Sequence, residues 1–176
     1  MGASWTWRAT VCSPYSRPRQ EPSALRLKSF RYQREMPHIK HVGTFPLFHF
    51  RALAQRAACD DALFVGADGL IAEASIWNIG FASGSGDATR IVWPRAPQLD
   101  GVGMRVLQAG LAKKGIASVT QPVRLSELGA FRAAFVTNAS TVAQLVTHID
   151  GTEFARNTAL QALLTRCHDA VPAEPI

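Results

Sequence analysis

Residues 68–81, DGLIAEASIWNIGF, place a single carboxylate, Glu73, in a segment that otherwise reads as an apolar strand after a turn. Strand alternation puts Ile71, Glu73 and Ser75 on one face, so Glu73 can point to solvent from a hairpin. The alternative is a buried Glu73, and a buried carboxylate is costly unless it meets a partner. The question for this sequence is therefore what Glu73 meets.

Short apolar runs separated by turns surround this segment. Strands are expected at 25–33, 62–65, 70–81, 90–93, 116–123, 133–137 and 143–154. Helices are expected from Phe45 to the stop at Asp60 and Asp61, over 101–115, over 126–131 and over 157–170. Thr44 is the expected cap of the first helix and Asp100 that of the second. Many strands with a few separated helices indicate an α+β fold, not a doubly wound parallel sheet.

The excess of positive charge lies at the beginning of the chain. Residues 1–40 hold eight Lys and Arg against two Glu, whereas the remaining 136 residues hold eleven of each sign. Residues 1–24 are rich in Pro, Ser and Arg, so we expect an extended basic arm, disordered or non-native, before a domain at 25–176. Binding of nucleic acid by this arm is an alternative that would show steep salt dependence, but we expect no nucleic-acid partner.

Cysteine and hydropathy patterns bear on location and metal binding. The three cysteines, Cys12, Cys59 and Cys167, are far apart and no secretory signal is visible, which predicts a cytoplasmic protein. No apolar run reaches the roughly 18 residues of a membrane-spanning helix, so no membrane partner is expected. No CxxC pair occurs, and we expect no metal site.

Several ordered blocks of sequence together resemble one enzyme family. The blocks are MPHIKHVGTF (36–45), DDALFVGADGLIAEASIWNIGF (60–81), PQLDGVGMRVL (97–107), FRAAFVTNAS (131–140) and THIDGTEF (147–154). In their order and spacing the chain resembles class IV aminotransferases, the fold-type IV enzymes of pyridoxal 5'-phosphate (PLP), which include branched-chain and D-amino-acid aminotransferases and aminodeoxychorismate lyase. The resemblance covers about 25–176 and implies the C-terminal large domain of these enzymes, a mixed, largely antiparallel sheet or pseudo-barrel with flanking helices. From this resemblance we expect the chain to lack the small N-terminal domain with which family members begin.

The resemblance implies roles for three residues around the cofactor ring. Lys40 matches the lysine that forms the Schiff base with PLP and, once freed, moves a proton between the substrate and the cofactor. Glu73 matches the glutamate that faces the pyridine nitrogen and keeps it protonated, which makes the ring an electron sink. Asn78 matches an asparagine with a supporting hydrogen-bond role.

The resemblance also implies contacts to the phosphate and the substrate. The backbone N–H groups of Val102 and Gly103 would bind phosphate at a helix N-terminus, although many members have threonine at the position of Gly103. Asn138, Ala139 and Ser140 match the loop that contacts phosphate and substrate. Two features depart from the family. Phe45 stands where some transaminases have tyrosine. The arginine that the N-terminal domain of the family supplies for the phosphate has no counterpart that can be assigned, and either Arg31 or Arg34 is a candidate substitute.

Three functions remain open at this point. The first is PLP-dependent transfer of an amino group from an amino acid to a 2-oxo acid. The second is lyase chemistry, in which the same electron sink expels pyruvate from an aminodeoxychorismate-like substrate. The third is a truncated family member that folds without catalytic activity. The family resemblance further implies a homodimer.

Overall fold

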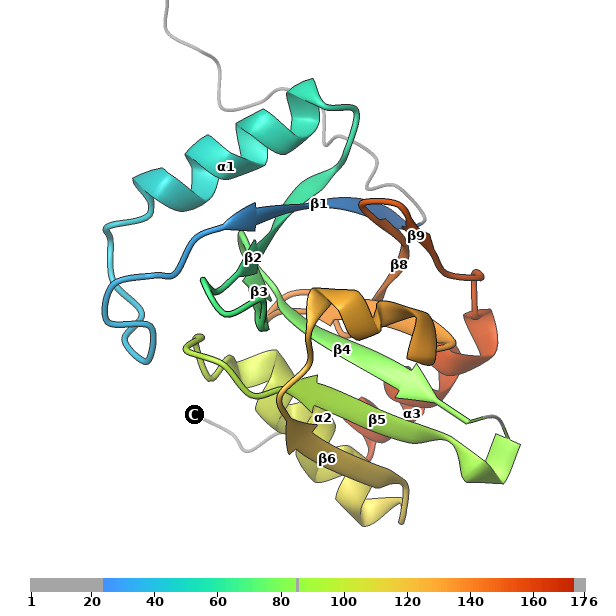
Figure 1. The fold of residues 1–176 in the computed structure, drawn as a ribbon. Helices are drawn as coiled ribbons and strands as arrows, with labels where there is room; N and C mark the ends of the chain where they lie inside the picture. The colour runs from blue at the N-terminus through green and yellow to red at the C-terminus, as the bar shows by residue number, and fades with distance from the viewer. Residues whose placement is uncertain (1–23, 85, 173–176) are drawn as a thin grey trace, which may run out of the picture.

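The computed structural model describes residues 24–84 and 86–172, which form one sheet with helices on its outer surface (Figure 1). The strands are β1 (Leu25–Arg31), β2 (Asp61–Val65), β3 (Ile71–Ala74), β4 (Asn78–Ser83), β5 (Arg90–Pro94), β6 (Ala117–Gln121), β7 (Ala133–Thr137), β8 (Gln144–Ile149) and β9 (Thr152–Glu153). The helices are α1 (Phe45–Arg56), α2 (Val102–Lys113) and α3 (Thr158–Asp169), with 3-10 turns η1 (Gly86–Ala88) and η2 (Leu125–Ala130).

The sheet closes on itself through six of its strands. The strand order is β3-β2-β1-β8-β7-β4-β5-β6, and an additional pairing between β3 and β4 completes a ring. Strands β5 and β6 continue the sheet beyond β4, and β9 pairs with β8. The pairs β1–β2, β1–β8 and β5–β6 are parallel and the others are antiparallel. The expected α+β fold with a mixed, largely antiparallel pseudo-barrel is therefore confirmed.

Alternation along the strands separates the inside of the ring from its outside. In β2, Leu63 and Val65 belong to the core inside the ring, whereas Ala62 and Phe64 belong to a separate core with Leu47 and Ala54 of α1. Every residue of β2 is buried, because α1 covers the outer face of β1 and β2 (Figure 1). A fully buried strand of this kind shows no polar face in its sequence.

Helices α2 and α3 cover another part of the outer surface. They pack on each other and enclose a core with Trp93 of β5 and Phe135 of β7. The two helices approach closely at Gly110, where an added Cβ would lie 2.0 Å from the carbonyl oxygen of Cys167. Glycine is therefore required for this contact.

Three local expectations are wrong. The strand expected over 70–81 is a tight hairpin, in which β3 ends at Ala74 and β4 begins at Asn78. Asp61 does not end α1, which stops at Arg56, but begins β2 and is buried. Asp100 does not cap α2, whose N-cap is Gly101; the Asp100 carboxylate instead lies 3.9 Å from Arg105 Nε.

The beginning of the chain and its helices bear on the expected arm and on membrane crossing. Residues 1–23 of the predicted basic arm lie outside the described residues, so the arm and its boundary at residue 24 stay predictions. Within 24–84 and 86–172, none of the helices combines the length and apolar character needed to cross a bilayer.

Candidate functional site

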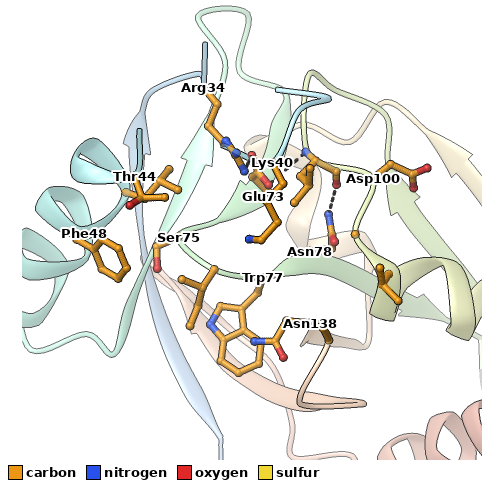
Figure 2. Close-up of a pocket in the computed structure, with 16 residues that line it drawn as sticks. Arg34, Lys40, Thr44, Phe48, Glu73, Ser75, Trp77, Asn78, Asp100 and Asn138 are labelled. Atoms are coloured by element: carbon orange, nitrogen blue, oxygen red, sulfur yellow. Dashed lines mark hydrogen bonds and ion pairs between the residues drawn. The ribbon is translucent and has the colours of Figure 1, made fainter. Parts of the chain in front are cut away.

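A cavity of about 340 Å³ gathers residues from segments far apart in the chain (Figure 2). Its volume is in the range of small-molecule sites. It is lined by Arg34, Lys40, Thr44, Leu47, Phe48, Glu73, Ser75, Ile76, Trp77, Asn78, Leu99, Asp100, Gly101, Val102, Asn138 and Ala139. Among the described residues, no three His, Cys, Asp or Glu side chains lie together as a possible metal site.

Lys40 reaches the cavity from the loop between β1 and α1. The loop holds its own shape through His41, whose Nδ1 accepts the backbone N–H of Gly43 at 3.0 Å. The other ring nitrogen, Nε2, therefore carries the proton and donates to the carbonyl oxygen of Glu35 at 3.2 Å. Lys40 itself is exposed at the cavity, so its amine is accessible to a ligand from solvent.

Glu73 is buried, and its partners are the backbone N–H of Leu99 and the side chain of Arg34. The residue is 5% exposed and its Oε2 accepts the backbone N–H of Leu99 at 3.3 Å. Its other oxygen, Oε1, lies 3.7 Å from Nη1 of Arg34 and has no hydrogen-bond partner. Burial raises the pKa of Glu73, whereas the Arg34 charge, the Leu99 N–H and the Lys40 charge lower it. A buried carboxylate oxygen without a donor is suited to a ligand that brings one.

Asn78 acts with Glu73 from the facing strand. The two residues are paired across the β3–β4 hairpin, and Asn78 Nδ2 donates to the carbonyl oxygen of Leu99 at 2.7 Å. Glu73 and Asn78 thus hold both polar groups of Leu99 and fix the loop that leads into α2. Gly101 fits this arrangement because an added Cβ would lie 2.1 Å from Asn78 Oδ1.

Asp61, at the start of β2, accepts hydrogen bonds from two residues of the β3–β4 hairpin. The Ser75 hydroxyl donates to Asp61 Oδ1 at 2.5 Å, and Trp77 Nε1 donates to Asp61 Oδ2 at 3.0 Å. Burial raises the pKa of Asp61, and the hydrogen bond from Ser75 and the charge of Arg51 oppose this. The sequence does not indicate this role of Asp61. Trp77 packs in the core inside the ring and also lines the cavity. An acid next to a fully apolar run is the only signal that marks Asp61 in the sequence.

The N-terminus of α2 opens onto the cavity. Its N-cap, Gly101, makes no side-chain cap, and the first turn contains no acidic residue. The N–H groups of the first helical residues, Val102 and Gly103, have no partner within the helix by geometry, and the helix dipole adds positive potential there. Val102 lines the cavity, while Gly103 is buried behind it with its Cα side against the carbonyl of Asn138.

The loop after β7 forms a compact turn around Asn138. Its Oδ1 accepts hydrogen bonds from the N–H of Ser140 at 3.0 Å, the hydroxyl of Ser140 at 3.0 Å and the N–H of Thr141 at 2.9 Å. Asn138 and Ala139 line the cavity. Ser140 is exposed and is not among the lining residues, so its hydroxyl stabilises the turn.

The structure brings six of the eight expected site residues to one cavity. Lys40, Glu73, Asn78, Val102, Asn138 and Ala139 line it, and Gly103 and Ser140 lie next to lining residues. Arg34 lines the cavity and Arg31 does not, which separates the two arginines that the sequence left equivalent. Phe45 is 77% exposed and stacks on His49, away from the cavity lining.

Comparison with known protein families gives the relationship of this chain. The sequence profile of the family described as amino-transferase class IV matches residues 6–149. The chain belongs to the class IV aminotransferases. No curated protein sequence matches it. The family match begins at residue 6, within the segment expected to be an arm.

Solved structures of class IV enzymes share this fold. The chain is similar to a hypothetical aminotransferase from Mycobacterium tuberculosis in its PLP-bound form, with a TM-score of 0.73, 17% identity and coverage of 84% of this chain and 55% of that chain. A protein described as a 4-amino-4-deoxychorismate lyase from Legionella pneumophila matches with a TM-score of 0.75 and 18% identity, and the match covers 84% of this chain and 56% of that chain. The branched-chain aminotransferase from Thermoproteus uzoniensis with norvaline matches with a TM-score of 0.72 and 20% identity, and the match covers 82% of this chain and 50% of that chain. The chain therefore spans about half the length of these relatives, which at such identities share its fold.

Proposed function

We propose that this class IV chain forms the cofactor-binding part of a PLP-dependent enzyme. The observation that carries the proposal is the presence of an accessible amine, Lys40, and a buried carboxylate with one free oxygen, Glu73 Oε1, in the same cavity. A pyridine nitrogen that bears a proton supplies the donor that Glu73 Oε1 lacks. Bound PLP supplies an electron sink for the reacting carbon of an amino acid. The M. tuberculosis relative has a PLP-bound form, which supports the same cofactor here.

Each part of the cavity has a task in this proposal. Lys40 supplies the amine that holds the cofactor covalently and later carries a proton at the substrate carbon. Glu73 accepts the hydrogen bond of the ring nitrogen, and Asn78 keeps the loop at Leu99 beside it. The N–H groups of Val102 and Gly103 would receive the phosphate at the N-terminus of α2, with Asn138 and Ala139 beside it and Ser140 holding the turn of that loop.

Transamination between an amino acid and a 2-oxo acid is the reaction that we propose first. Another form of the M. tuberculosis relative contains α-ketoglutarate and PMP, and the T. uzoniensis enzyme contains norvaline. These ligands are an acceptor 2-oxo acid and an amino acid, which supports the same substrate classes for this chain. A lyase that releases pyruvate is the second candidate, because the L. pneumophila relative is described as an aminodeoxychorismate lyase. Lys40 and Glu73 serve both reactions.

An apolar rim around the cavity supports a homodimer as the working form. Phe48, Ile76 and Val102 line the cavity and are 53%, 40% and 65% exposed. Exposed apolar side chains gathered at a site indicate a contact surface, and a second copy of the chain could cover it. Because the chain spans about half of its relatives, a folded member without turnover is the alternative. We further propose action in the cytoplasm.

The proposal is tested by covalent capture of PLP. The purified chain is mixed with PLP and reduced with borohydride, and the modified peptide is located by mass spectrometry. We expect PLP on Lys40 and a visible absorption band that Lys40→Ala lacks, with Lys28→Ala as the control. Identical, featureless spectra for all three proteins would overturn PLP binding. With the loaded protein, 2-oxo acid consumption supports transamination, whereas release of pyruvate from aminodeoxychorismate supports the lyase.

A further inference from the structure

Arg34 is a buried cation in the wall of the cavity. It follows β1, is 8% exposed and points toward Glu73 (Figure 2). Its Nη1 lies 3.7 Å from Glu73 Oε1, and its Nη2 donates to the carbonyl oxygen of Ile39 at 3.2 Å. Ile39 is the residue immediately before Lys40. One guanidinium group therefore contacts both the carboxylate of Glu73 and the peptide that leads into Lys40.

The rigid shape of the Arg34 guanidinium links its contact with Glu73 to its contact with Ile39. A buried charge is tolerated only when it is paired and hydrogen-bonded, and both side chains of the Arg34–Glu73 pair are 7% exposed. The planar guanidinium holds its nitrogens at fixed positions, so the place of Glu73 and the place of the Ile39 carbonyl are set together. A lysine at position 34 keeps the charge but has one nitrogen on a flexible stem.

The loop of Lys40 has few other restraints toward the sheet. The contacts of His41 with Glu35 and Gly43 are made within residues 35–43 and do not reach β3. Arg34 connects this loop to β3 through two contacts, the hydrogen bond to Ile39 within the loop and the ion pair with Glu73 of β3. Nη2 of Arg34 makes the hydrogen bond to Ile39, whereas Nη1 faces Glu73 at 3.7 Å as an ion pair without a hydrogen bond, and Nε has no hydrogen-bond partner.

We propose that Arg34 is a positioning residue that fixes the lysine loop and the Glu73 carboxylate relative to each other. The inference rests on the proposed function, because it concerns the two groups that would hold PLP. It assigns to Arg34 a role that differs from phosphate binding, for which the sequence had left Arg31 and Arg34 as equivalent choices. Arg34 acts through Glu73 and Lys40 without contact to the reacting atoms.

Measurements on the PLP-free protein test the two contacts separately. In Arg34→Met we expect the pKa of Glu73, followed by carboxyl carbon NMR, to rise by about one unit or more, because a nearby opposite charge lowers a carboxyl pKa by roughly 1–3 units. Amide hydrogen exchange at residues 35–43 becomes faster. Arg34→Lys retains most of the Glu73 titration but loses the protection of the loop. The control is Arg56→Met, an exposed arginine at the end of α1.

PLP capture completes the test. We expect the affinity for PLP to fall about tenfold in Arg34→Met and less in Arg34→Lys, as expected when a site loses one positioning contact. If the unaltered chain captures PLP and both variants match Arg56→Met in affinity, titration and exchange, the inference on Arg34 is overturned and the proposed function stands. If the unaltered chain captures no PLP, the proposed function falls and this inference with it.

Should Arg34→Met fail to fold, Arg34→Lys decides. Loss of protection at 35–43 together with weaker PLP capture supports the positioning role. Unchanged exchange and affinity in Arg34→Lys refute it, because a positive charge alone would then be sufficient.

Discussion

Replacing Gly103 with alanine should separate α2 from the loop after β7. An added Cβ would lie 2.3 Å from the carbonyl oxygen of Asn138 and 2.8 Å from Thr137 Oγ1. The carbonyl is backbone and cannot rotate away, so helix and loop must move apart by about 1 Å to reach a normal contact distance. Overpacking costs about 1–3 kcal/mol, and the higher helix propensity of alanine offsets up to about 1 kcal/mol. We therefore expect a net loss of up to about 2 kcal/mol in the free energy of unfolding.

This movement should also weaken PLP binding, because the proposed phosphate donors lie at the displaced helix end. Loss of one hydrogen bond to a charged group costs about 1.5–3 kcal/mol, which corresponds to roughly a 10- to 100-fold weaker affinity. Urea unfolding measures the first effect and titration with PLP the second. The matched control is Gly129→Ala, since nothing lies within 4 Å of its added Cβ. Equal stability and equal PLP affinity of the two alanine variants would refute the reasoning.

Three further perturbations test other contacts by urea unfolding. Asn157→Ala removes the acceptor for the Leu160 N–H at 2.9 Å and should cost about 1 kcal/mol, and an unchanged midpoint would show that α3 needs no cap. Trp77→Phe leaves Asp61 Oδ2 without its Trp77 donor and should cost about 1–3 kcal/mol, whereas a neutral result would deny the support of the hairpin by Asp61. Burial raises the pKa of Glu73 above 4.5, so protonation of Glu73 favours the folded state. The stability of the unaltered chain relative to Glu73→Gln should therefore be highest below pH 4.5 and should decline as the pH rises through the folded pKa. An increase of this difference with pH would contradict the expectation.

The sequence predicts the fold and the site where local pattern and family resemblance agree. The apolar run at β7 and the helical stripe of α1 are periodic, and the ordered blocks around Lys40, Glu73 and Asn138 lie in one cavity of the structure. The family match bears out the resemblance. Order and spacing of the blocks are informative because four of the five blocks contribute residues to the same cavity.

Other features depend on contacts between distant segments and leave little trace in the sequence. Arg31 and Arg34 look alike until the chain turns after β1 and buries only Arg34. Asp61 looks like a helix stop because its donors, Ser75 and Trp77, come from a hairpin that follows later in the chain. The break of the hairpin after Ala74 is hidden because residues on both sides are apolar and suit a strand equally well.

The closure of the ring by β1 and β8 affects the chain while it is being translated. Strand β1 lies between β2 and β8, and Leu25 pairs with Val146. At about 5–20 residues per second, β8 leaves the ribosome roughly 10 s after β1, and until then β1 presents an unsatisfied edge that can pair with another nascent chain.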